Sequence, residues 1–207
     1  MLKNFFILCL LLGSVSFSVH ATSPNEILEN FISNTKSLSA DFEQQLVDQS
    51  GAIMQQSKGR LSMMRPGKFR WDYSEPYPQN IISNGMKIWM YDSELEQVSI
   101  RRYDQVLASS PVNLLDRNQK LDIEFNVEIM PAREGQDWVK LTPKKDGGDF
   151  KELIIGLQNN QIKTMRFFDN FEQRTEIKFD HLVINPKFEA AYFEFKAPEG
   201  TDVVGDF

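Results

Sequence analysis

Cysteine is almost absent from this chain of 207 residues, whose single cysteine is Cys9. Cys9 lies inside the apolar N-terminal run and follows Leu8, whereas a lipidated cysteine follows a small residue at the end of such a run. We therefore expect Cys9 to carry no lipid anchor. The chain beyond it can form no disulfide, so its rigidity must come from packing and hydrogen bonding.

Histidine is nearly as scarce, and His181 is the only one beyond the first 20 residues. This scarcity excludes a histidine-rich metal site and a Cys–His pair. The chain also lacks a G-x-S-x-G elbow, an H-E-x-x-H motif and a glycine-rich phosphate loop. We predict a protein that is not an enzyme, with no catalytic residue, no metal and no cofactor. His181 is interpreted as a surface histidine, and a glycosidase-like carboxylate pair stays open although no cluster of acidic residues points to one.

Basic residues and long apolar runs are also limited. The 23 basic residues are outnumbered by 29 acidic ones, for a net charge of −6. An acidic balance favours solubility and argues against nucleic-acid binding. No run after the N-terminal segment is long and apolar enough to span a bilayer.

The N-terminal segment has the three parts of a secretory signal peptide. Lys3 supplies the positive charge, residues 5–12 form a short apolar run, and Val19-His20-Ala21 is a small-x-small cleavage site. We predict cleavage after Ala21, which leaves residues 22–207 as one secreted domain.

One segment has a strong helical period. Ser23-Pro24-Asn25-Glu26 resembles a capping box with proline at the first helical position. Apolar residues then recur at three- and four-residue spacing, which predicts a helix from about Pro24 to Ser37. The residues on this face are Ile27, Leu28, Phe31, Ile32 and Thr35.

Most of the remaining chain alternates apolar and polar residues with a period of two, which is typical of strands. Asn84-Gly85 between two apolar runs is the strongest hairpin signal, and further turns are expected at residues 48–51, 146–148 and 159–160. This pattern predicts an antiparallel meander, which must curl, close or split to protect its edges. Alternating residues include Ala40, Phe42 and Leu46; Phe69, Trp71 and Tyr73; Leu121, Ile123, Phe125, Val127 and Ile129; Thr175, Ile177 and Phe179; and Phe193 and Phe195.

The strand period is interrupted between Tyr103 and Arg117. Within this stretch, residues 110–115 suggest a short helix with Ser110 as its cap. A second short helix is expected at residues 186–192. The sequence therefore predicts a mainly β protein, a curved sheet with a few helices covering one face.

Residues 59–73 hold two methionines and three aromatic residues around an Arg-Pro turn. Met86, Trp89, Met90 and Tyr91 follow nearby. An ordinary sheet core explains most of these residues. Methionine, however, adapts to ligands of variable shape, and a large barrel can enclose a cavity. An apolar-ligand protein is therefore one interpretation.

Four segments of the chain also match a known pattern in order and spacing. They are Gly59-x-Leu61 with Arg65-Pro66-Gly67-Lys68-Phe69-Arg70-Trp71; Ile81-Ile82-Ser83-Asn84-Gly85 with Ile88-Trp89-Met90-Tyr91-Asp92 and Leu95-Glu96-Gln97-Val98; Leu141-Thr142-Pro143-Lys144; and Phe193-x-Phe195-x-x-Pro198-x-Gly200-x-Asp202-Val203. Jointly they cover nearly the whole chain and resemble the outer-membrane lipoprotein carrier family, LolA.

The resemblance implies an unclosed antiparallel barrel, a half-barrel, under a helical lid. It implies a soluble, monomeric periplasmic shuttle that takes acylated lipoproteins from an ATP-driven inner-membrane exporter and delivers them to an outer-membrane receptor. The related receptor family, LolB, shares the fold but is itself lipidated, so the absence of a lipidation motif favours the carrier.

The resemblance also implies a gate. In the family, the arginine of the Arg-Pro motif ties the lid to the barrel through backbone carbonyls. By position this arginine is Arg65, with partners expected near Ile32 and near Leu115 and Asp116. An arginine presents five donors in a fork, which suits this role. Without the resemblance, a solvated arginine at a strand end is the simpler interpretation.

The aromatic of the same motif is implied to contact the exporter and receptor, and it corresponds to Phe69. Plain core packing with Trp71 and Tyr73 is the alternative interpretation. Cavity-lining roles are expected for Phe31, Met63, Trp71, Trp89, Met90 and Leu114. Trp89 and Met90 cannot both face inward on a regular strand.

Three rival functions remain open from the sequence: a periplasmic carrier of another lipid or glycolipid, a lipoprotein-sensing module, and a hydrolase. The cargo retained by the secreted protein would separate the carriers. Sensing modules usually carry an additional domain.

Overall fold

The computed structural model describes residues 22–103, 112–116, 120–145 and 150–205. The predicted signal peptide and the turn at residues 146–148 lie outside the described residues. Within the described part of the chain, no helix combines the length and apolar character needed to cross a bilayer.

Helix α1 extends over Pro24–Asn34 and begins where the capping box predicts. The Glu26 side chain accepts a hydrogen bond from the Ser23 N–H at 3.1 Å. The helix ends before the predicted Ser37 because Thr35 takes an extended conformation, and its hydroxyl donates to the Phe31 carbonyl at 2.6 Å. Ser37 instead begins the first strand.

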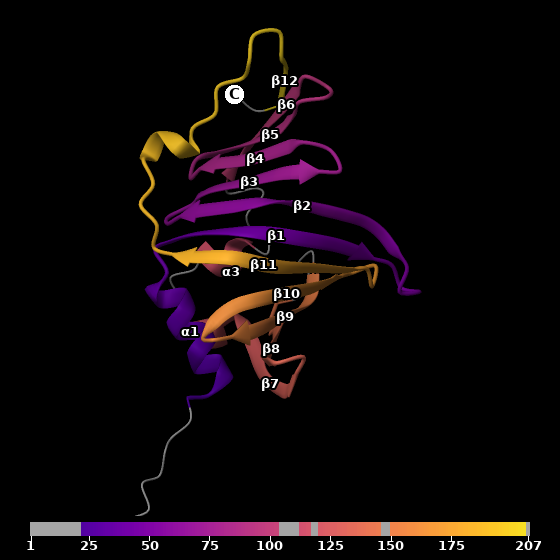
Figure 1. Cartoon of the computed structure of the whole chain (residues 1–207), viewed down its shortest axis with the longest axis vertical. Coiled ribbons are helices and arrows are strands. Elements are labelled where there is room, and N and C mark those ends of the chain that lie inside the picture. Colours follow the sequence, from indigo (N-terminus) through magenta and orange to yellow (C-terminus); the bar gives the residue numbers. More distant parts are fainter. Residues whose placement is uncertain (1–21, 104–111, 117–119, 146–149, 206–207) are drawn as a thin grey trace, which may run out of the picture.

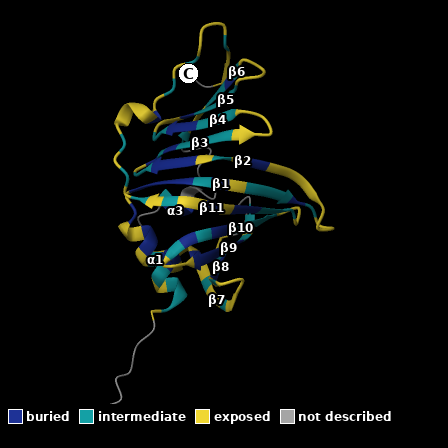
Figure 2. Cartoon of the chain, in the orientation of Figure 1, coloured by how far each residue is buried: buried dark blue, intermediate teal, exposed yellow. Residues whose placement is uncertain are grey.

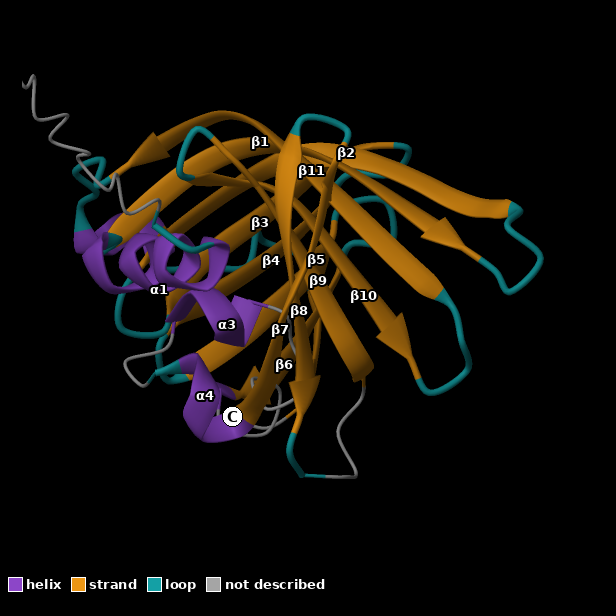
Figure 3. Cartoon of the chain, turned by 90° about the horizontal axis from the view of Figure 1, so that it is seen from below, coloured by secondary structure: helices purple, strands orange, loops and turns teal. Residues whose placement is uncertain are grey.

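Twelve strands form a single sheet that curls without closing (Figures 1 and 3). Their order is β12-β6-β5-β4-β3-β2-β1-β11-β10-β9-β8-β7. The strands are β1 (Ser37–Val47), β2 (Ile53–Met64), β3 (Lys68–Glu75), β4 (Gln79–Asn84), β5 (Lys87–Asp92), β6 (Gln97–Arg102), β7 (Phe125–Arg133), β8 (Gln136–Pro143), β9 (Phe150–Gln158), β10 (Gln161–Asp169), β11 (Arg174–Ile184) and β12 (Asp202–Gly205).

The antiparallel meander is confirmed in two halves, β1–β6 and β7–β11. Strand β1 joins them by pairing with β2 on one side and with the distant β11 on the other. The exception to antiparallel pairing is β12, which runs parallel to β6 and covers that edge of the sheet. The predicted hairpin at Asn84-Gly85 connects β4 to β5, and Gly85 has the positive φ of +91° that the turn requires.

Two predictions of strand structure are wrong. Leu121–Glu124 forms a short helix, α4, before β7 begins at Phe125. The helix is held to the end of β8 because Lys144 donates from its backbone N–H to the Glu124 carbonyl at 2.8 Å. Phe193 and Phe195 do not form a strand either, since Phe193 ends a 3-10 turn, η1 (Ala190–Phe193). The helix predicted at 186–192 is reduced to this turn.

Helices α1, α3 (Val112–Asp116) and α4 lie on the concave, inner side of the sheet (Figure 3). The α3 helix agrees with the one predicted from residues 110–115, of which Ser110 and Pro111 lie outside the described residues. Buried residues gather at the ends of β1–β3 near α1, whereas the β1–β2 hairpin tip is exposed (Figure 2). The helices therefore cover one end of the concave face and are called the lid below.

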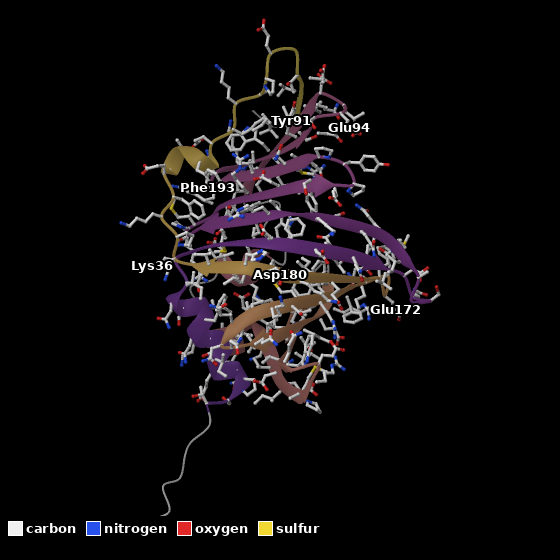
Figure 4. All side chains as sticks on the ribbon, in the orientation of Figure 1. Lys36, Tyr91, Glu94, Glu172, Asp180 and Phe193 are labelled. Atoms are coloured by element: carbon white, nitrogen blue, oxygen red, sulfur yellow. The ribbon has the colours of Figure 1, made fainter. Side chains whose placement is uncertain are left out.

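The outer side of the sheet has a cover of its own. The segment after β11 crosses β3 and β4 through η1, and Phe193 on it is fully buried (Figures 1 and 4). Tyr192 stacks under the Arg70 guanidinium at 5.1 Å, and Arg70 donates to the Tyr192 carbonyl at 3.2 Å. The C-terminal segment thus covers the outer face of β3 and β4, whereas α1 and α4 pack against β7, β8 and β10 in the other half of the sheet.

Candidate functional site

The inner face of the sheet is apolar because every second residue of each strand points to this face, and many of these residues have large apolar side chains. Leu61, Trp71, Ile81 and Met90 stand in one row across four neighbouring strands. Met63 and Phe69 stand opposite one another in the next row. All six belong to, or pack against, one hydrophobic cluster. Such a surface suits an apolar ligand once it is uncovered.

The lid helices occupy this hollow with their own side chains. Phe31 and Ile32 of α1 and Leu114 and Leu115 of α3 are buried in the same cluster as the sheet residues. One cavity bordered by described residues of the helices and the sheet measures about 10 Å³, which is roughly the space for one water molecule. Its lining residues are Phe31, Leu38, Leu61, Leu115, Ile162, Phe179 and Leu182. This cavity could admit an apolar chain only if the helices moved.

Arg65 fastens α3 to the sheet. Its Nε donates to the Leu115 carbonyl at 2.7 Å, and its Nη2 donates to the same oxygen. This carbonyl lies in the last turn of α3, where it has no partner within the helix, and a cation is favourable there. Burial lowers the pKa of Arg65 while the charge of Asp116 opposes that shift, and an arginine stays charged in either case. Of the expected partners, Leu115 is bonded, whereas the hydrogen bonds of the described residues include none from Arg65 to Ile32.

Asp116 provides a second fastening through its side chain. Its two carboxylate oxygens each accept from the Gly67 N–H at 3.0 Å, and Oδ2 accepts from the Tyr103 hydroxyl at 2.7 Å. Gly67 is itself tied to β4, because the Ser83 hydroxyl donates to its carbonyl at 2.8 Å. No signal in the sequence pointed to Tyr103, since nothing in the local pattern links a residue after β6 to α3.

Gly67 could be substituted only with difficulty. Its φ is +71°, and a Cβ there would lie 2.8 Å from the Gly85 Cα and 3.1 Å from the Tyr103 ring. The β2–β3 and β4–β5 turns and the Tyr103 side chain therefore approach each other closely beneath α3. This junction, formed by Arg65, Gly67, Tyr103, Leu115 and Asp116, is called the latch below.

Trp89 and Met90 lie on opposite faces of β5, as strand geometry requires. Met90 packs against the inner cluster. Trp89 instead lies on the outer face, with its ring centroid 6.4 Å from that of Phe195 in the C-terminal segment. Trp89 is therefore withdrawn as a cavity-lining residue, because the alternation alone did not say which parity faces inward.

Phe69 is 6% exposed and belongs to the inner cluster. This is the position that the core-packing interpretation predicts for Phe69. A partner protein could touch the Phe69 ring only after the packing around it has opened.

The outer face has a hollow of about 630 Å³ over Gly59, but its chemistry differs. Asp41 accepts from Arg60 at 2.9 Å and lies 2.9 Å from Nδ1 of His181. The His181 side chain is 83% exposed and sits at a bulge where the pairing of β1 with β11 shifts. Seven of the twelve residues that line this hollow are acidic or basic, although Phe42 and Tyr73 also border it, so it suits an apolar chain less well than the inner face does. In the described ranges, no group of His, Cys, Asp and Glu residues could hold a metal ion.

Comparison with known proteins identifies relatives of this chain. The family described as "Outer membrane lipoprotein carrier protein LolA" matches residues 33–196. The chain is 40% identical over 185 residues to an outer-membrane lipoprotein carrier protein of Methylococcus capsulatus, covering 89% of each chain. It is 39% identical over 179 residues to one of Dechloromonas aromatica, covering 86% of each chain.

Solved structures share the fold at low identity. An uncharacterized conserved protein from Thermus thermophilus superposes with a TM-score of 0.53 at 16% identity, over 87% of this chain and 98% of that chain. A likeness at this identity supports the sheet architecture alone.

Proposed function

The chain belongs to the LolA family of outer membrane lipoprotein carrier proteins, and we propose that it holds lipoprotein acyl chains against the inner face of its curved sheet. The observation that carries this proposal is an apolar inner face covered by short helices instead of by a second sheet. Helices of five and four residues contribute little stability on their own, so their position depends on packing that a ligand can replace.

The lid sets the balance between binding and release. Each buried methylene gains about 0.8 kcal/mol, so long acyl chains strongly favour a covered apolar surface over water. Phe31, Ile32, Leu114 and Leu115 already bury the same surface in the closed form. The net affinity is therefore the difference between two free energies, that of burying the inner face with acyl chains and that of burying it with the helices. This small difference keeps release possible without an energy source in the carrier itself.

Membership of the family supports finer proposals. We propose a monomeric periplasmic shuttle, without catalytic activity, loaded by an ATP-driven inner-membrane exporter and unloaded at a LolB-like outer-membrane receptor. Phe69 is the proposed contact for these partners in the lid-open form. Its burial in the closed form would restrict that contact to loading and unloading.

Arg65 is the proposed gate, acting with Leu115 and Asp116. By fastening α3, it stabilises the empty closed form and so favours release of cargo. Arg65→Leu weakens the closed form, so we expect the variant to bind acylated lipoprotein and to transfer it poorly to a receptor. Arg60→Leu is the matched control, since Arg60 lies on β2 and pairs with Asp41 on the outer face.

In the experiment, wild type and each variant are purified from periplasm, and the acylated protein that co-purifies is measured. Receptor is then added, and the transfer of this cargo to the receptor is measured. Wild type and Arg60→Leu should hand over their cargo, and Arg65→Leu should retain it. Normal transfer by Arg65→Leu would refute the gate. Mass spectrometry of the retained cargo decides between lipoproteins and other lipids, and a carrier holding only glycolipid or phospholipid would refute the lipoprotein assignment.

A further inference from the structure

The indole N–H of Trp71 is a buried donor without an acceptor. The Trp71 side chain is 8% exposed, and its Nε1 is shielded from solvent with no hydrogen-bond partner among the described residues. Buried polar groups are nearly always paired, because an unpaired one loses its interaction with water and gains nothing in return. An unpaired donor therefore needs an explanation.

Two other aromatic donors among the described residues, those of Trp138 and Tyr73, are paired. Trp138 is fully buried on the outer side, and its Nε1 donates to the Arg133 carbonyl at 3.0 Å. Tyr73, which shares the inner face with Trp71, donates from its hydroxyl to Oε1 of Gln44 at 3.3 Å. The fold can thus satisfy such donors, and it leaves the one at Trp71 unsatisfied.

Two other buried side-chain atoms lack a partner within the described residues, Oε1 of Gln136 and Nε of Arg174. Both residues have the strand parity opposite to that of the inner cluster, which includes Val139 of β8 and Ile177 of β11. The Trp71 N–H is therefore the unpaired group that belongs to the inner face.

Trp71 also stands in the wall of the proposed acyl site. It lies directly opposite Leu61 of β2, which lines the small cavity under the lid, and opposite Ile81 of β4. Its ring meets the Phe42 ring edge-on, with centroids 5.1 Å apart. The N–H therefore belongs to an otherwise apolar surface, where a new hydrogen bond is strong because water does not compete for it.

We propose that the Trp71 N–H recognises acyl chains by donating a hydrogen bond to an acyl carbonyl oxygen. This inference rests on the proposed function. A hydrocarbon tail offers no acceptor, whereas an ester- or amide-linked acyl chain carries a carbonyl at its head. One donor in an apolar wall thus selects acyl groups over alkyl groups of equal length. It also helps loading, because the ligand pairs a group that the empty form leaves unpaired.

The test compares uncharged lipid groups of equal length with and without this carbonyl. The first pair is a dipalmitoylglyceryl-cysteine peptide and its dihexadecyl ether analogue. The second is an N-palmitoyl peptide and an analogue whose N-terminal residue carries an O-hexadecyl ether in place of the palmitoyl amide. Wild type should bind the carbonyl-bearing member of at least one pair about tenfold more tightly. Trp71→Phe should reduce that ratio to below about twofold, since it keeps an aromatic ring and removes the donor.

Two controls separate the hydrogen bond from packing. Trp89→Phe makes the same substitution on the outer face and should keep the wild-type ratio. Benzothienylalanine at position 71 replaces the N–H by sulfur at almost unchanged shape, and should lose the ratio as Trp71→Phe does. This second replacement decides the question if Trp71→Phe folds poorly.

The outcomes distinguish this inference from the proposed function. If the two replacements of Trp71 abolish the preference for the carbonyl ligand in the first pair, the hydrogen bond is to an ester carbonyl. If they abolish it in the second pair, the bond is to an amide carbonyl. Equal binding of carbonyl and ether ligands by wild type, or a ratio that survives both replacements, overturns the role of Trp71 alone. Failure of wild type to bind any of the four ligands overturns the acyl site itself, and the role of Trp71 with it.

Discussion

Tyr73 is a titratable residue on the inner face, and its burial there changes its pKa. Burial raises the pKa of Tyr73 to about 12, although the hydrogen bond to Gln44 acts in the opposite direction. The unfolded chain ionises near pH 10, so above that pH it binds fewer protons than the folded chain. The free energy of unfolding should therefore fall as pH rises from 10 to 12, while the full stability is present below pH 10.

Urea unfolding at pH 8 and pH 11.5 measures this loss. Tyr73→Phe should lose less stability over that range than wild type, by on the order of 1 kcal/mol after allowance for the partial exposure of the ring. Tyr77→Phe is the control, because Tyr77 is 66% exposed, and it should follow wild type. Identical slopes for wild type and Tyr73→Phe would contradict the prediction.

Tyr103 offers a test of the latch that leaves Arg65 in place. Burial raises the pKa of Tyr103, and the hydrogen bond to Asp116 and its charge raise it further, so the hydroxyl remains a donor at neutral pH. Tyr103→Phe removes one hydrogen bond to a carboxylate and should shift the lid toward opening. We expect the empty variant to bind N-phenyl-1-naphthylamine about three- to tenfold more tightly than wild type.

The matched control for this titration is Tyr192→Phe. Tyr192→Phe also removes a hydroxyl contact, the one to Ser62 at 3.3 Å, but this contact lies on the outer face. This variant should therefore leave binding of the dye unchanged. If Tyr103→Phe and Tyr192→Phe bind the dye equally, Asp116 and Tyr103 do not hold the lid.

At the scale of elements, the two covers of the sheet should behave differently. The C-terminal segment buries Phe193 completely against the outer face, away from the proposed acyl site. Phe193→Ala should lower the free energy of unfolding by about 3–5 kcal/mol, as expected for a buried phenylalanine. Dye binding per folded molecule should be unchanged.

Chemical unfolding monitored by circular dichroism measures this effect. Phe171→Ala is the control, because Phe171 is 76% exposed, and it should change stability by no more than about 0.5 kcal/mol. A Phe193→Ala variant as stable as wild type would mean that the outer segment adds nothing to the core.

At the scale of the whole molecule, loading should separate the lid from the sheet. Amides of α1 should exchange hydrogen faster once a dipalmitoylglyceryl-cysteine peptide is bound, because the ligand takes over the surface that the helix covers. Amides of β1, β2 and β11 at the centre of the sheet should stay protected. Hydrogen exchange with mass spectrometry measures both, and unchanged protection of α1 would contradict displacement of the lid.

The sequence predicted elements where the signal is local. The capping box at Ser23 fixed the start of α1, and Asn84-Gly85 fixed one hairpin. It failed at Leu121, where a residue with the parity of a strand lies in a short helix. It also failed at Trp89, because a period of two assigns residues to two faces without saying which face is inner.

The sequence by itself determined the alternating strands, the lack of any cysteine after Cys9 and, through resemblance, the family. Only the tertiary structure decided that β1 pairs with β11, that Leu115 accepts from an arginine 50 residues earlier, and that Trp71 keeps an unpaired N–H. The reason is physical: local patterns record propensity and period, whereas these contacts join residues far apart in the chain. Their partners are set by how the sheet curls and where the helices pack.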